Sequence, residues 1–195
     1  MPPRAKFTKE EIIEAALGIV REKGISELTA RALGNALGSS SCPIFTVFAN
    51  MDEVHENVIE AAKKVYKSYM DKGIPQTPAF RGVGEQYVLF AVEEPNLFKL
   101  LFMSENENMP AFTGVLPLLD ESYDTILLSI SEGYNLTKEQ AANLYRHLWV
   151  YTHGIATLCV TKICRFTAEQ INEMTTEVFL SLLNSAKGET RDDCF

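Results

Sequence analysis

The segment from Thr29 to Phe48 constrains the fold more than any other part of the chain. It consists of TARALGNALG followed by SSSCPIFTVF. The first part has the apolar spacing of a short helix that Thr29 can cap, and Gly38 suits a tight turn. Serines can cap a second short helix, in whose first turn Pro43 has no hydrogen bond to lose. Two short helices joined in this way are the layout of a helix-turn-helix, whose second helix enters the major groove of DNA.

Helix signals continue along the rest of the chain. Capping boxes, in which a threonine is followed three residues later by Glu or Gln, occur at Thr8, Thr137 and Thr167. Proline and glycine interrupt the helical spacing between residues 73 and 78 and again at Pro95. The sequence therefore predicts an all-α protein with no strand and nine helices, at about 8–22, 29–37, between 39 and 50, 51–71, 79–93, 95–102, 111–132, 138–163 and 168–186.

Composition limits the class of protein. The chain has 195 residues, of which 46% are hydrophobic and 23% charged, as in ordinary globular domains. It lacks an apolar run of about 18 residues, so we expect no membrane span. The residues after Met1 carry no apolar signal core, and we therefore expect a cytoplasmic protein.

The distribution of charge agrees only weakly with DNA binding. The net charge is -8, but residues 1–50 hold six basic and five acidic residues, so this part carries +1 and the remainder -9. The acidic excess thus lies away from the segment with the helix-turn-helix pattern. A charge of +1 nevertheless argues mildly against tight non-specific binding of DNA.

Cysteine and histidine do not form a metal-binding pattern. No CxxC pair occurs, and the spacing matches no zinc motif. We expect reduced thiols, no metal and no cofactor. The residues concerned are Cys42, Cys159, Cys164, Cys194, His55, His147 and His153.

The order and spacing of several residues resemble the TetR family of bacterial one-component regulators over about residues 8–60. The residues that carry the resemblance are Ile12, Ile13, Ala15, Ala16, Gly24, Thr29, Leu33, Gly38, Ser40, Ile44, Phe45, Phe48 and Val54. Further along, Trp149, His153 and Gly154 resemble a short motif of some TetR subfamilies. The resemblance implies a three-helix DNA-binding domain at 1–50 and a helical effector-binding and dimerisation domain at 51–195.

The resemblance also indicates which residues meet DNA. Serine hydroxyls at the start of the second short helix can bond base edges, and Pro43, Ile44 and the Thr46 methyl can pack on thymine methyls. Thr29 lies at a helix start suited to a phosphate, and basic side chains supply charge. The ring of Phe45 lies either along the DNA backbone or inward. The predicted DNA-binding residues are Arg4, Lys6, Thr29, Arg31, Ser39, Ser40, Ser41, Cys42, Pro43, Ile44, Phe45, Thr46 and Asn50.

Three positions depart from the family's usual pattern. The family commonly has Tyr at the position of Phe45 and Lys at that of Met51, and both residues usually contact phosphates. Gly34 stands in the first short helix, where glycine is expected to cost about 1 kcal/mol. These differences leave the fold prediction unchanged but weaken the predicted affinity for phosphates.

Aromatic residues and methionine are frequent in the middle helices, which can form an adaptable apolar pocket or an ordinary core. His153 is either a ligand-sensing group or a satisfied core residue. The predicted pocket residues are Tyr87, Phe90, Phe98, Phe102, Met103, Phe112, Tyr123, Trp149 and His153. The resemblance implies a two-fold dimer formed by the last two helices, with Tyr151, Ile155, Leu158, Val178 and Leu182 at the interface.

These observations favour a homodimeric transcriptional repressor. It binds double-stranded operator DNA, and a small apolar or amphipathic effector releases it from that DNA. One alternative is a helical small-molecule-binding protein or enzyme, but no nucleophile–base pair or phosphate-binding glycine loop supports catalysis. Another is a regulator with a weakened DNA-binding head that acts through protein partners.

Overall fold

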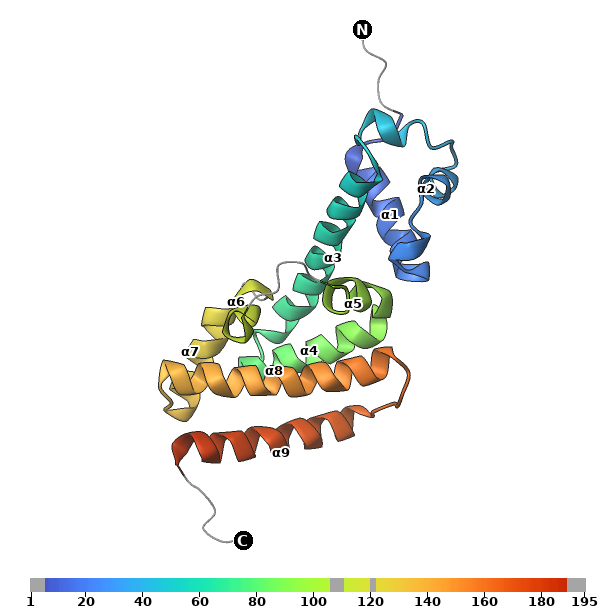
Figure 1. Cartoon of the computed structure of the whole chain (residues 1–195). Helices are drawn as coiled ribbons and strands as arrows, with labels where there is room; N and C mark the ends of the chain where they lie inside the picture. Colours follow the sequence, from blue (N-terminus) through green and yellow to red (C-terminus); the bar gives the residue numbers. More distant parts are fainter. Residues whose placement is uncertain (1–5, 106–110, 120–121, 189–195) are drawn as a thin grey trace. The chain divides into compact units, whose positions relative to one another are not determined.

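Helices form all the regular structure in the residues that the computed structural model describes, which are 6–105, 111–119 and 122–188 (Figure 1). The prediction of an all-α protein is confirmed for these residues. The α-helices are α1 (Lys9–Lys23), α2 (Ala30–Ala36), α3 (Met51–Gly73), α4 (Ala79–Glu93), α5 (Pro95–Phe102), α6 (Val115–Leu119), α7 (Tyr123–Tyr134), α8 (Lys138–Val160) and α9 (Ala168–Lys187). Three short 3-10 helices accompany them, η1 (Ile25–Glu27), η2 (Ile44–Thr46) and η3 (Phe112–Gly114).

The chain divides into two compact units. The first is drawn from Met1–Tyr66 and Glu93–Glu105, and the second from Lys67–Val92 and Asn106–Phe195. Because α5 lies in the first unit, this unit combines residues from both sides of α4 in the sequence. Helix α3 contributes residues to both units. The functional division at residues 50 and 51 stays a prediction.

The core of the first unit forms around α1. Thr8 and Glu11 make the predicted capping box at its start, and Ile12, Ala16 and Val20 are completely buried along it. Helix α1 packs against α2 and α5. At its end, the Arg21 guanidinium donates to both carboxylate oxygens of Glu94, at 2.9 and 3.1 Å. This bidentate pair fixes the start of α5 against α1.

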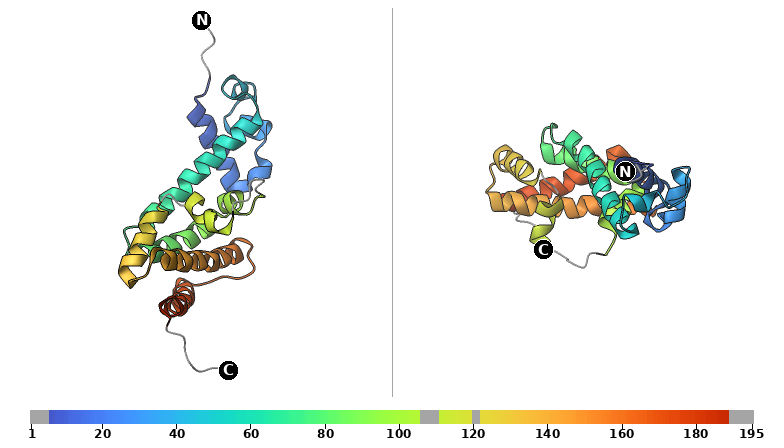
Figure 2. Two further views of the ribbon diagram at one scale, coloured as in Figure 1. Left: turned by 60° about the vertical axis from the view of Figure 1, so that its left-hand side comes forward. Right: turned by 90° about the horizontal axis from the view of Figure 1, so that it is seen from above.

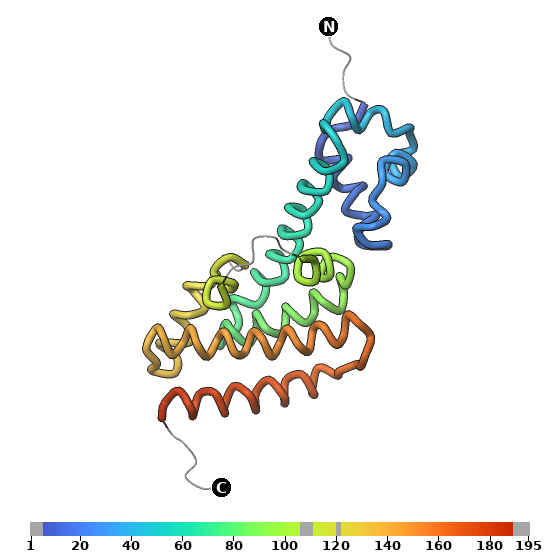
Figure 3. The backbone as a smooth tube through the Cα atoms, viewed as in Figure 1, coloured from blue at the N-terminus to red at the C-terminus, as the bar shows by residue number. Residues whose placement is uncertain are grey.

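In the second unit, α7 and α9 both pack on α8 (Figures 1 and 2). Helices α8 and α9 lie side by side and run in opposite directions, as the backbone trace shows (Figure 3). The amide of Gln140 near the start of α8 donates to the carbonyl of Ala186 near the end of α9, at 2.7 Å. Both helices begin with the predicted capping boxes, at Thr137 and Thr167.

The second helix of the helix-turn-helix differs from the prediction, because it is a single 3-10 turn (Ile44–Thr46) and not an α-helix. None of the preceding serines caps it with a side-chain hydrogen bond. Ile44, Thr46 and Val47 are β-branched and lose rotamer freedom in a helix. The Thr46 hydroxyl also donates to the carbonyl of Pro43 at 2.6 Å, a local bond that competes with helix extension.

The single helix predicted at 111–132 is also wrong, since η3, α6 and α7 occupy this region of the described residues. Pro117 has no N–H to donate to the carbonyl of Thr113, so a regular α-helix cannot pass through this position from η3. The preceding Gly114 has low helix propensity as well. Helix α6 therefore begins anew at Val115 with Pro117 in its first turn, and α7 begins at Tyr123, so two α-helices lie where one was predicted.

Candidate functional site

The turn between α2 and the following serines is built around two glycines. Thr29 caps α2, since its Oγ1 accepts the N–H of Ala32 at 3.1 Å. Gly38 has φ +61°, a left-handed conformation that glycine adopts without strain. The N–H of Ser39 then donates to the carbonyl of Gly34 at 2.9 Å. The chain thus reverses direction directly over α2.

Gly34 is the point of closest approach in this turn. A Cβ atom at this position would lie 2.9 Å from the carbonyl carbon of Ser40 and 3.0 Å from the backbone nitrogen of Ser41. Both neighbours are backbone atoms and cannot rotate away as a flexible side chain could. Gly34 therefore lowers the helix propensity of α2, but the close packing of the turn requires a glycine at this position.

Basic side chains lie beside the same turn. Lys6 donates from Nζ to Oγ of Ser39 at 3.0 Å, which places the described end of the N-terminal arm next to the serines. Arg31 is exposed on the first turn of α2. Arg4, also predicted to bind DNA, lies outside the described residues.

Most of the predicted DNA-binding residues in this unit are accessible. Phe45 is 45% exposed, so its ring does not pack inward. Asn50 accepts the N–H of Glu53 at Oδ1, at 2.9 Å, and so caps α3. The exposed residues are Lys6, Thr29, Arg31, Ser40, Cys42, Phe45, Thr46 and Asn50, whereas Ser39, Ser41 and Pro43 are half-buried.

Ile44 differs from the others because it is completely buried. Its side chain belongs to the core of the first unit, together with Phe48, which is 1% exposed. In this conformation it has no surface with which to meet a thymine methyl. The buried side chain of Ile44 therefore anchors η2 to the core of the first unit. It is not part of the DNA-binding surface that we propose.

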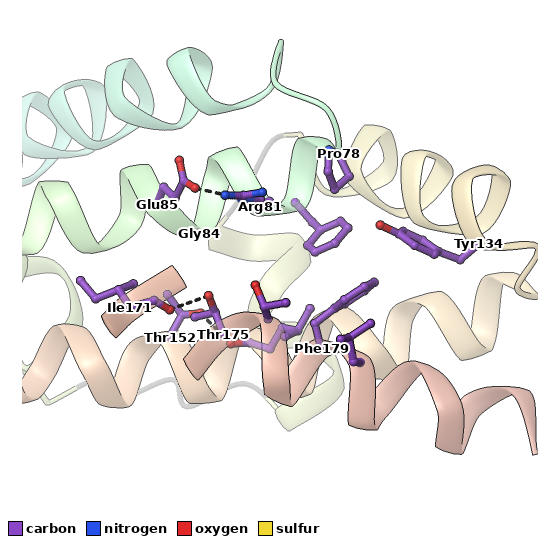
Figure 4. A pocket seen from close by; sticks show the side chains of 13 residues that line it. Pro78, Arg81, Gly84, Glu85, Tyr134, Thr152, Ile171, Thr175 and Phe179 are labelled. Atoms are coloured by element: carbon purple, nitrogen blue, oxygen red, sulfur yellow. Dashed lines mark hydrogen bonds and ion pairs between the residues drawn. The ribbon is translucent and has the colours of Figure 1, made fainter. Parts of the chain in front are cut away.

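The second unit contains a pocket of about 220 Å³ between α4, α7, α8 and α9 (Figure 4). On the α4 side, Arg81 donates from Nε to Glu85 at 3.1 Å. On the opposite side lie the hydroxyl groups of Thr152 and Thr175. The remaining lining residues are Pro78, Phe80, Gly84, Tyr134, Leu148, Ile171, Thr176, Phe179 and Leu180.

None of the nine predicted pocket residues lines this pocket. Phe98, Phe102 and Met103 belong to the first unit, whereas the other six belong to the second, so the nine do not form one site within either unit. Tyr87, Phe90 and Phe98 are almost or completely buried and fill the cores. The other predicted pocket residues of the second unit are Phe112, Tyr123, Trp149 and His153.

Three of the predicted residues do form a cluster in the second unit. The Tyr87 hydroxyl and Nδ1 of His153 are joined by a hydrogen bond of 2.8 Å. The rings of Trp149 and His153 are stacked, with centroids 5.3 Å apart and 28° between their planes. Burial lowers the pKa of His153 below its ordinary value. His153 is thus a half-buried, hydrogen-bonded histidine whose surroundings favour the neutral ring.

We expect the stability of the protein to fall as the pH is lowered through this histidine's titration. Because its pKa is lower when folded than when unfolded, protonation favours the unfolded chain, and the stabilisation present above about pH 6.5 is lost below it. Melting temperatures measured between pH 8 and pH 5 should show this loss. It should be smaller in His153→Asn and unchanged in His147→Asn, whose side chain is exposed on the same helix. An equal loss in all three proteins would contradict the assignment.

The sequence prediction missed the lining residues Arg81, Glu85, Thr152 and Thr175. Each had a weak signal. Arg81 and Glu85 are spaced as an ion pair on one helix face, and both threonines interrupt otherwise apolar helix faces. Such signals become informative only when the packing of four helices is known.

The predicted dimer residues lie on α8 and α9. Tyr151, Leu158, Val178 and Leu182 are half-buried, whereas Ile155 is buried within its own chain. The same helices also expose the large apolar side chains of Val150 and Leu180. The interface itself stays a prediction.

The described residues contain neither a metal-binding cluster nor a membrane-spanning helix. In these ranges His, Cys, Asp and Glu form no group of three that could hold a metal ion. No described helix is both long and apolar enough to cross a membrane. Cys42, Cys159 and Cys164 are free thiols, and Cys194 lies outside the described residues.

Comparison with known proteins identifies a family for the chain. The family model described as "Tetracyclin repressor-like, C-terminal domain" matches residues 80–182, more than half of the chain. This range contains every residue that lines the pocket except Pro78. No curated protein matches the chain. The chain belongs to the TetR family of regulators.

Proposed function

We propose that this TetR-family regulator is a cytoplasmic, homodimeric transcriptional repressor that a small effector releases from operator DNA, and that it is not an enzyme. The family match of residues 80–182 is the observation that carries the proposal. The matched range does not include the helix-turn-helix, so DNA binding rests on the first unit's own geometry. That geometry comprises an exposed turn of serines, a capped helix start and the cations Lys6 and Arg31.

The proposed DNA-binding surface combines positioning and sequence-reading contacts. The N-terminus of α2, with Thr29 and Arg31, suits phosphates. The exposed side chains of Ser40 and Thr46 suit base edges, although hydroxyl groups discriminate poorly between bases. A dimer would present two such surfaces to two half-sites about one helical turn apart.

Regulation requires that the effector bind one conformation of the protein more tightly than another. A coupling free energy of about 1–3 kcal/mol would lower operator affinity roughly 5- to 150-fold. Helix α3 runs without interruption from residues of the first unit into residues of the second, and is one of the covalent connections on which such coupling would act.

DNA binding can be tested by fluorescence anisotropy with a duplex from the region upstream of the protein's own gene. We expect sequence-dependent binding that weakens as salt increases. Arg31→Ala should weaken binding to all sequences and reduce the salt slope by about 1, whereas Thr46→Ala should weaken mainly the specific sequence. Lys63→Ala is the matched control, because Lys63 is an exposed cation of the first unit that pairs with Glu60 on α3.

A second candidate function is a regulator with a weakened DNA-binding head that acts through protein partners. It is favoured by the 3-10 turn in place of the second α-helix, and by Phe45 and Met51 at positions where the family commonly has Tyr and Lys. Absence of salt-sensitive, sequence-dependent binding, or equal binding by the wild type and both variants, would favour this candidate over the repressor.

A further inference from the structure

The size of the pocket in the second unit limits what it can hold. A cavity of about 150 Å³ accommodates benzene, so a volume of about 220 Å³ admits a single ring with small substituents. Aromatic side chains form one end of the pocket. The rings of Phe80 and Phe179 are stacked with centroids 4.8 Å apart, and Tyr134 meets Phe179 edge-on at 5.0 Å. Such a wall favours a flat, apolar ring.

The wall formed by α8 and α9 offers hydrogen-bond acceptors. The Thr152 hydroxyl donates to the carbonyl of Leu148 at 2.8 Å, and the Thr175 hydroxyl donates to that of Ile171 at 2.7 Å. A threonine hydroxyl has one hydrogen, so each oxygen has only lone pairs left for an occupant. Figure 4 shows both threonines on the same side of the pocket. An occupant that brings a donor to these two oxygens can therefore bond them without breaking either helix bond.

The wall formed by α4 offers donors without a net charge. Arg81 and Glu85 are the charged residues among those that line the pocket, and they pair with each other. Because these two half-exposed charges compensate each other, an ionic occupant would meet no net opposite charge at this wall. No described residue accepts from the terminal guanidinium nitrogens of Arg81, which can donate to an occupant's carbonyl oxygen.

We infer that the pocket binds a small, neutral, single-ring molecule that carries a hydroxyl or N–H donor at the threonine wall and a carbonyl acceptor near Arg81. 4-Hydroxybenzamide is a simple member of this class. The inference rests on the proposed function, because it names the chemical class of the effector that the second unit receives.

Isothermal titration of the purified full chain with four matched compounds tests the inference. 4-Hydroxybenzamide carries all the required groups. 4-Methoxybenzamide lacks the phenol O–H donor but keeps the amide, 4-hydroxybenzoate is an anion, and 4-hydroxybenzylamine is a cation at neutral pH. We expect 4-hydroxybenzamide to bind about fivefold more tightly than 4-methoxybenzamide, the factor that one net hydrogen bond supplies, and more tightly than both ions.

Two variants locate the binding in this pocket. Thr152→Val and Thr175→Val keep the side-chain shape but remove the acceptor oxygen, and each should weaken 4-hydroxybenzamide binding about fivefold. Binding of 4-methoxybenzamide should change little, which separates a lost contact from a damaged fold. Thr161→Val is the control, because its hydroxyl makes the same kind of bond, to the carbonyl of Thr157 at 2.7 Å, but does not line the pocket.

The inference is overturned if none of the compounds binds, if the anion or the cation binds most tightly, or if blocking the donor or removing the threonine oxygens changes nothing. These titrations contain no DNA, so their result is independent of operator binding. If 4-hydroxybenzamide binds as expected but operator affinity does not change in its presence, the ligand class stands and its role as an effector fails.

Discussion

A Gly34→Ala variant is expected to be less stable than the wild type and to bind operator DNA at least tenfold more weakly. Its new methyl group would meet the backbone of Ser40 and Ser41, so the turn must move away from α2. Overpacking of this kind costs about 1–3 kcal/mol, and the better helix propensity of alanine offsets only about 1 kcal/mol of this. The displaced turn carries the proposed base contacts, and small displacements of such contacts reduce affinity strongly. Urea unfolding and anisotropy titration measure the two effects.

Gly18→Ala is the matched control for this experiment. Gly18 lies in α1, and a Cβ there would meet nothing within 4 Å. The same substitution should therefore stabilise the protein by up to about 1 kcal/mol and leave DNA binding unchanged. A Gly34→Ala protein that is as stable as Gly18→Ala and binds DNA normally would show that the turn does not approach α2 as closely as the structure describes.

Features that depend on neighbours in the sequence could be predicted. The three capping boxes at Thr8, Thr137 and Thr167 were identified correctly, because a cap joins residues only three positions apart. The predicted α-helix at η2 is wrong although its signals were also local. Caps and a proline at the right position permit a helix there, but the β-branched residues and the burial of Ile44 decide the backbone conformation.

The pocket could not be predicted, because the residues that line it come from four helices far apart in the sequence. A search for aromatic residues selects large apolar side chains, and these are the residues that fill a core most completely. Tyr87, Phe90 and Phe98 are predicted pocket residues of this kind, and they are 2%, 0% and 0% exposed. A pocket forms where large side chains do not fill the space between helices. In this protein that space is lined by threonines and an ion pair as well as by aromatic rings.

A large loss of stability is expected from Phe48→Ala. Phe48 is one of the largest fully buried side chains among the described residues, and its ring lies 5.4 Å from Nζ of Lys9. Replacing a buried phenylalanine by alanine removes its transfer free energy and leaves a cavity, which together cost about 3–5 kcal/mol. The loss should appear as a lower urea midpoint in circular dichroism. Because Phe48 lies two residues after η2 in the chain and shares the core with Ile44, DNA binding should be lost as well.

Phe45→Ala, three residues earlier in the chain, distinguishes a loss of folding stability from a loss of DNA binding. With 45% of its surface exposed, Phe45 contributes little to the core, and its removal should change the free energy of unfolding by less than about 1 kcal/mol. If its ring lies along the DNA backbone, the variant should nevertheless bind operator DNA more weakly. Equal destabilisation by the two substitutions would mean that both rings are buried, and the exposed surface of η2 would then no longer support the proposed DNA contact. A stable Phe45→Ala protein with unchanged affinity would instead restrict the proposed base and phosphate contacts to the serines, Thr46 and the cations.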